Sequence, residues 1–139
     1  MTDEKPELLF SDLQVGRSFR PLAYKVTKQL VDEFMDTVGD RNSLYSAEES
    51  SIAPPGFAAI YARLSYLQDH TMPAGGVLAK QEFEFHNSIR VGETIYIAAK
   101  VIESCLDEKQ RKRVTFFIEA KDKDNALISV IRLYAIWPK

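Results

Sequence analysis

The last third of the chain holds three long stretches, two in which apolar and polar residues alternate and a third that is almost wholly apolar. They cover residues 94–105, 112–121 and 126–137, and only short polar turns separate them. A period of two residues is typical of a β-strand, and consecutive strands joined by short turns pair antiparallel. The sequence therefore predicts an antiparallel meander. A fourth alternating stretch, residues 77–86, is expected in the same sheet.

Two helical patterns precede these strands. Over residues 28–38 apolar side chains recur at helical spacing, Thr27 is a good N-cap, and Gly39 stands where a left-handed C-terminal cap is expected. A second pattern, residues 57–68, follows two prolines and is apolar on most of its faces, which predicts a buried helix. A strand is expected over residues 19–26. Early helices followed by antiparallel strands indicate an α+β fold.

Composition narrows the class of protein. The chain has 139 residues, of which 45% are hydrophobic, and a formal net charge of −2, so we expect one domain over residues 1–139 with a flexible lead-in at residues 1–9. The absence of a basic block argues against nucleic acid as a partner. No apolar run reaches the roughly 20 residues that span a membrane. With a polar start and a single cysteine, Cys105, the sequence suggests a cytoplasmic protein.

The connection between the two helical patterns carries a short motif made of Gly39, Asp40, Asn42 and Leu44. It resembles the signature of the MaoC-like hydratase/dehydratase family, which reads roughly Gly-Asp-x-Asn-Pro-Leu-His. Tyr45 stands where that family has the histidine. Some family members with tyrosine there also carry an Ala-Pro-Pro segment soon after it. Those are typically partner subunits or domains that shape the acyl tunnel beside an intact Asp-His pair.

A second stretch extends the resemblance. The residues from Phe85 to Ile95 are similar to the family segment that reads Phe-x-x-Pro-Val-x-x-Gly-Asp-Thr-Leu and leads into its long strands. The resemblance implies a hot-dog fold, in which a long central helix is wrapped by a curved antiparallel sheet of about five strands. It also implies a dimer with the site at the interface, either a homodimer or a heterodimer with a MaoC-like homologue.

The resemblance implies chemistry on an acyl thioester, carried by coenzyme A or by acyl carrier protein, of the kind found in fatty acid metabolism. In the family, water adds to a 2-enoyl thioester or leaves a 3-hydroxyacyl thioester, and a carboxylate and an imidazole move the proton. Asp40 matches the carboxylate and Asn42 its neighbour. A phenol titrates near pH ~10 and an imidazole near ~6.5, so Tyr45 is a poor base. It either fills the space of the histidine or donates a hydrogen bond.

The start of the second helix is the expected substrate-binding element. In the family, a backbone N–H there polarises the thioester carbonyl. Pro55 has no N–H, which leaves Gly56 and Phe57 as the nearest donors, with Gly56 as the candidate. An ordinary helix start explains the same residues. The two histidines lie far apart and no cysteine cluster is present, so no metal site and no cofactor are expected.

Three functions remain open from the sequence. The first is a hydratase/dehydratase-family protein with a degenerate Asp-His pair, which works weakly through Asp40 or supports an intact partner subunit. If it is active, it is an enoyl-thioester hydratase or 3-hydroxyacyl dehydratase. The second is a non-catalytic module that binds acyl thioesters. The third is an acyl-CoA thioesterase on the same fold.

Overall fold

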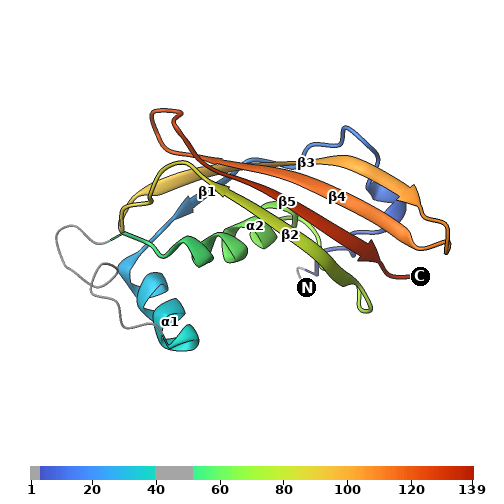
Figure 1. Ribbon diagram of the computed structural model, residues 1–139, viewed down its shortest axis with the longest axis horizontal. Helices are drawn as coiled ribbons and strands as arrows, with labels where there is room; N and C mark the ends of the chain where they lie inside the picture. Colours follow the sequence, from blue (N-terminus) through green and yellow to red (C-terminus); the bar gives the residue numbers. More distant parts are fainter. Residues whose placement is uncertain (1–3, 40–51) are drawn as a thin grey trace.

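The computed structural model describes residues 4–39 and 52–139 (Figure 1). Asp40, Asn42 and Tyr45, the expected catalytic residues, lie outside the described residues. The described parts form a curved sheet with one helix, α2 (Ala58–Tyr66), against its concave face, and another helix, α1 (Lys28–Val38), beside the start of α2. This arrangement places the residues around the start of α2 at one end of the sheet.

The sheet has five strands in the order β1-β3-β4-β5-β2, and every neighbouring pair is antiparallel. The strands are β1 (Leu22–Lys25), β2 (Val77–Phe85), β3 (Thr94–Leu106), β4 (Lys112–Lys121) and β5 (Leu127–Trp137). The predicted meander of three long strands is confirmed as β3, β4 and β5. The strand predicted over residues 19–26 is shorter, because regular pairing with β3 begins only after Pro21.

The first helix, α1 (Lys28–Val38), ends where the sequence predicts. The hydroxyl of Thr27 accepts a hydrogen bond from the backbone N–H of Leu30. Gly39 has a φ of 74°, and its N–H donates to the carbonyl of Met35. A side chain is disfavoured at that backbone angle, which explains the glycine.

The second helix, α2 (Ala58–Tyr66), is three residues shorter than predicted: Phe57 belongs to a 3₁₀ turn, η3 (Pro55–Phe57), and the helix ends two residues early, at Tyr66. Pro54, just before it, is extended. A further 3₁₀ turn, η1 (Phe10–Asp12), lies near the N-terminus. None of the helices within residues 4–39 and 52–139 is long and apolar enough to cross a membrane.

The core lies between α2 and the concave face of the sheet. Tyr61, Ala62 and Tyr66 point from α2 toward β3, β4 and β5, and the ring of Tyr66 stacks on Phe116 with their centroids 4.3 Å apart. The inward-facing residues of the strands are almost all buried and apolar, which drives the packing of the helix on the sheet. They are Ile95, Ile97, Ala99, Val101, Val114, Phe116, Ile118, Ala120, Ile131 and Leu133.

The lead-in contacts the rest of the chain from Pro6 onward. The backbone N–H of Leu8 donates to the carbonyl of Thr71, and the N–H of Thr71 donates to the carbonyl of Pro6. Leu8 and Leu13 are fully buried. Two apolar anchors and a pair of backbone hydrogen bonds therefore hold a segment whose polar composition suggested fraying.

Candidate functional site

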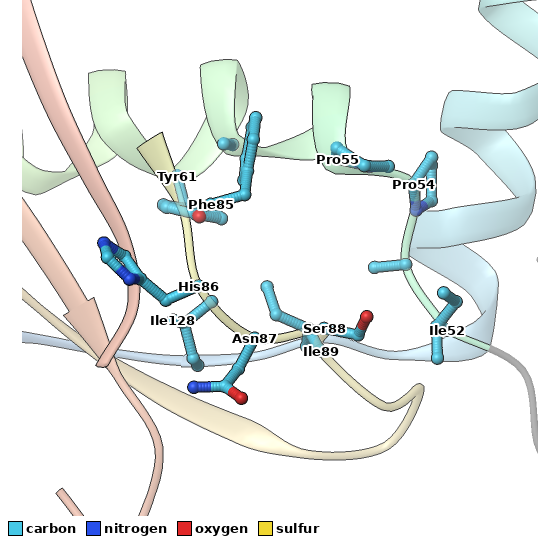
Figure 2. A pocket seen from close by; sticks show the side chains of 12 residues that line it. Ile52, Pro54, Pro55, Tyr61, Phe85, His86, Asn87, Ser88, Ile89 and Ile128 are labelled. Carbon is cyan, nitrogen blue, oxygen red and sulfur yellow. The ribbon is translucent and has the colours of Figure 1, made fainter. Parts of the chain in front are cut away.

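A cavity of about 230 Å³ lies where the start of α2 meets the loop that follows β2 (Figure 2). Its lining is mostly apolar, as is usual for sites that bind small organic ligands. The lining residues are Ile52, Ala53, Pro54, Pro55, Ala58, Tyr61, Phe85, His86, Asn87, Ser88, Ile89 and Ile128. The described chain resumes at Ile52, directly after the segment that contains Asp40, Asn42 and Tyr45.

One wall of the cavity is the extended segment that leads into α2. The N–H of Ala53 donates to the carbonyl of Ile89 at 2.8 Å, and Ile52 forms an isolated β-bridge with Arg90. These contacts tie the segment to the loop after β2. Pro54 and Pro55 then face the cavity (Figure 2). Two consecutive prolines fix the backbone here without adding N–H donors, so they make the wall both rigid and apolar.

The expected substrate-binding residues are arranged around this helix start. Pro55 lines the cavity. Phe57 is buried and points instead into the core, where its ring packs against Phe34 and Tyr24, and its N–H donates to the carbonyl of Pro54. Within residues 4–39 and 52–139, the N–H of Gly56 has no hydrogen-bond acceptor. Of the two donors that the sequence nominated, only Gly56 therefore has an N–H to offer to a ligand.

The deep side of the cavity holds a buried polar pair that the sequence analysis missed. The phenol oxygen of Tyr61, on α2, lies 2.6 Å from the hydroxyl oxygen of Ser129, on β5. Burial raises the pKa of Tyr61, and the hydrogen bond to Ser129 opposes that effect. The phenol is therefore neutral at physiological pH. The signal available in the sequence was a polar atom on each of two segments that are otherwise predicted to be buried.

His86 borders the cavity, but its imidazole is turned away from the start of α2. Its Nε2 lies 3.2 Å from Oε1 of Glu84, and Figure 2 shows the ring on the side away from Pro54 and Pro55. The neighbouring Asn87 uses its side-chain NH₂ to donate to the carbonyl of Leu127. Among the described residues, no imidazole projects into the cavity. The loop after β2 therefore forms part of the cavity wall, and Ser88 is one of its polar residues there.

A second cavity, of about 410 Å³, lies between α2 and the strands β2 and β5. Tyr66, Phe116, Leu133 and Trp137 form its floor, and Arg63 stands among the residues that line it. Gly76 also lines this cavity, and no room is left there for a side chain, because an added Cβ would lie 2.5 Å from the methyl carbon of Met72. The lining is predominantly apolar, so this space suits a hydrocarbon group better than a charged one.

Comparison with known proteins identifies the class. The sequence matches the model of the FAS1-like, dehydratase domain region family over residues 13–123, and the chain belongs to that family. Its fold is the hot-dog fold of the MaoC-like hydratases and dehydratases, as the motif resemblance implied. No curated protein matches the sequence significantly.

Three solved structures illustrate the likeness in fold. A monoamine oxidase regulatory protein from Archaeoglobus fulgidus superposes with a TM-score of 0.81 at 19% identity, covering 97% of each chain. The R-hydratase PhaJ1 from Pseudomonas aeruginosa gives 0.73 at 16% identity, covering 94% of this chain and 85% of that one. The HadBC 3R-hydroxyacyl-ACP dehydratase complex from Mycobacterium tuberculosis gives 0.73 at 17%, covering 88% and 96%.

Proposed function

We propose that this protein binds an acyl thioester in the cavity at the start of α2, as a member of the hydratase/dehydratase family with an altered catalytic pair. The observation that carries the proposal is the N–H of Gly56, which has no acceptor among the described residues and stands between the cavity-lining Pro55 and Ala58. A helix start is the positive end of the helix dipole. A thioester carbonyl placed there gains a hydrogen bond that strengthens as negative charge develops on its oxygen.

The catalytic side of the proposal rests on Asp40 and Tyr45. Asp40 is the residue proposed to hold a water, with Asn42 shaping its loop. Tyr45 supplies a phenol where an imidazole is usual, and a phenol is a weak base at neutral pH because it titrates near ~10. We therefore expect slow hydration by this chain alone and faster turnover when a homologue with an intact Asp-His pair is present.

The exposed edge of the sheet supports an oligomer. β2 is an edge strand, and its large apolar side chains Val77, Leu78, Phe83 and Phe85 are exposed. An unpaired edge rich in apolar side chains favours pairing with another strand. The proposed partner is a second copy of this chain or a MaoC-like homologue. The HadBC neighbour is itself a complex.

A non-catalytic module that binds acyl thioesters is the second candidate. The observation that favours it is the orientation of His86, since no imidazole of the described residues reaches into the cavity. Such a module would use the same Gly56 N–H and the same apolar lining. It would differ from the first candidate only in lacking turnover.

Hydration of a short 2-enoyl-CoA by the purified protein separates these functions. We expect slow formation of the 3-hydroxyacyl-CoA, and a further loss of rate in Asp40→Asn. Turnover that does not respond to Asp40→Asn contradicts a catalytic role for this residue. Binding of acyl-CoA without any turnover identifies the binding module. Release of free thiol from a saturated acyl-CoA points to a thioesterase instead. Failure to bind any acyl-CoA at high concentration overturns the proposal.

A further inference from the structure

The hydroxyls of Tyr61 and Ser129 form a polar pair in an otherwise apolar part of the core. Tyr61 is 1% exposed and Ser129 is 0% exposed, and their oxygens lie 2.6 Å apart. Around them are α2 on one side and the inward face of β5 on the other. Burying two hydroxyls costs free energy unless both are hydrogen-bonded. The hydrogen bond between them gives an acceptor to one of the two hydroxyl protons but not to the other.

The two hydroxyls have one more proton than the hydrogen bond between them uses. Each hydroxyl carries one proton and can also accept. The bond between them uses one proton, whichever residue donates it. Within residues 4–39 and 52–139, neither hydroxyl has a second partner. One hydroxyl proton therefore has no acceptor among these residues, and a buried donor without an acceptor is unfavourable.

The location of the pair indicates which of the two hydroxyls is beside the cavity. Tyr61 lines the 230 Å³ cavity, and Ser129 does not. Ser129 is the cross-strand partner of Phe85, which does line the cavity. Figure 2 shows Tyr61 among the residues that line the cavity. When Ser129 donates to Tyr61, the phenol keeps its own proton for an acceptor inside the cavity.

We propose that Tyr61, oriented by Ser129, donates a hydrogen bond to an oxygen of the bound ligand. This inference rests on the proposed function, because the ligand is taken to be an acyl thioester. Gly56 and Tyr61 lie five residues apart on η3 and α2, more than one helical turn. With the thioester carbonyl at Gly56, the next oxygen along a 3-hydroxyacyl chain is the 3-hydroxyl. Tyr61 is therefore assigned to that oxygen and selects 3-hydroxyacyl over saturated acyl groups.

Two ligands that differ in one oxygen test the assignment. Dissociation constants of 3-hydroxybutyryl-CoA and butyryl-CoA are measured by calorimetry for the wild type and for Tyr61→Phe. We expect the wild type to favour the hydroxylated ligand, and Tyr61→Phe to lower that preference by about fivefold, as for the loss of one hydrogen bond. The affinity for butyryl-CoA should stay unchanged, because that ligand offers no oxygen to Tyr61.

A double variant protects the test against misfolding. Tyr61→Phe alone leaves the buried Ser129 hydroxyl without its hydrogen-bond partner. Tyr61→Phe combined with Ser129→Ala removes both hydroxyls, so its thermal stability should be closer to that of the wild type. The preference must nevertheless stay lost in the double variant. Ser65→Ala is the matched control, because Ser65 is also buried on α2 but donates to the carbonyl of Ala62. It should leave the preference intact.

Three other results would contradict the inference. An unchanged preference in both Tyr61 variants overturns the inference while leaving the proposed function standing. Equal weakening of both ligands assigns Tyr61 a purely structural role and overturns it as well. A wild type that binds neither ligand overturns the proposed function, and the inference falls with it.

Discussion

The indole Nε1 of Trp137 donates a 2.7 Å hydrogen bond to the carbonyl oxygen of Leu8, and both residues are buried. Trp137 is the last residue of β5, and Leu8 belongs to the docked lead-in. The bond therefore joins the two ends of the chain beside the second cavity, which Trp137 also lines. Packing of the indole against Phe116 extends the contact into the core.

Replacing Trp137 with phenylalanine should destabilise the protein. The change leaves the buried Leu8 carbonyl without its donor, which costs about 1–3 kcal/mol, and the smaller ring adds a packing loss. Urea unfolding followed by circular dichroism measures the free energy of unfolding. Tyr96→Phe, at an exposed position on β3, should change it by less than about 0.5 kcal/mol. A Trp137→Phe protein as stable as the wild type would contradict the role given to this bond.

Restoring the family histidine with Tyr45→His should increase the hydration rate. An imidazole titrates near ~6.5 and can take a proton from water at neutral pH. A positioned general base contributes about 10²–10⁴-fold, so we expect a gain of about 10²-fold in kcat with a short 2-enoyl-CoA. The gain should vanish when Asp40→Asn is added, and Tyr45→Phe should give none. A folded Tyr45→His protein that binds acyl-CoA without any gain would separate Tyr45 from the site.

Placing a charge on the exposed edge strand should weaken the proposed dimer. Phe83 on β2 is 37% exposed, and a partner strand paired with β2 would cover it. In Phe83→Arg we expect the dissociation constant of the dimer to rise at least about tenfold, as measured by analytical ultracentrifugation. Ile102→Arg is the control, because Ile102 is 40% exposed on β3, which β4 and β5 separate from β2. Equal effects of both changes would argue against β2 as the interface.

Asp107 makes the stability of the β3–β4 turn dependent on pH. Desolvation raises its pKa, but hydrogen bonds from the backbone of Arg111 and Lys109 and from the guanidinium groups of Arg111 and Arg113 outweigh it, and the pKa of Asp107 falls well below its usual range. A lowered folded-state pKa stabilises the protein fully above the unfolded value of ~3.9. That stabilisation is lost as the pH falls from there through the folded-state value.

Asp107→Asn should therefore unfold at a lower temperature than the wild type at pH 7, with a nearly constant difference down to about pH 5. Below about pH 4 the difference between the two melting temperatures should shrink progressively, since the unfolded wild-type chain then binds a proton that the folded carboxylate takes up only in more acidic solution. Thermal unfolding across this range measures the difference. Asp124→Asn, in the β4–β5 turn, should show no such pattern. A difference that stays constant into strongly acidic solution would contradict the assignment.

The elements with a clear period or cap could be predicted from the sequence. Alternation identified β3 and β4, a long apolar run identified β5, and Thr27 with Gly39 bounded α1, because these signals are local. The contacts of the lead-in could not be predicted, because they depend on distant partners. Leu8 is held by Thr71 and Trp137, and no local pattern encodes such contacts.

The residues of the candidate site also fall into those that the sequence indicated and those that it did not. The proline pair lies in the wall of the cavity, and Pro55 is one of the expected substrate-binding residues. Asp40, Asn42 and Tyr45 stay predictions. The distinction between Gly56 and Phe57 required backbone hydrogen bonds, because Phe57 donates its N–H to Pro54. Tyr61 was missed because its partner, Ser129, lies 68 residues away, and only the packing of α2 on β5 brings the two together.

Trp137 is the only tryptophan in the chain, so the protein carries a built-in fluorophore at the junction of its two ends. Its indole is buried and hydrogen-bonded to the lead-in. Detachment of the lead-in would expose the indole to water and shift its fluorescence emission to longer wavelength. Because the same ring lines the second cavity, its emission can also report when a hydrocarbon group enters there, without any label on the protein or the ligand.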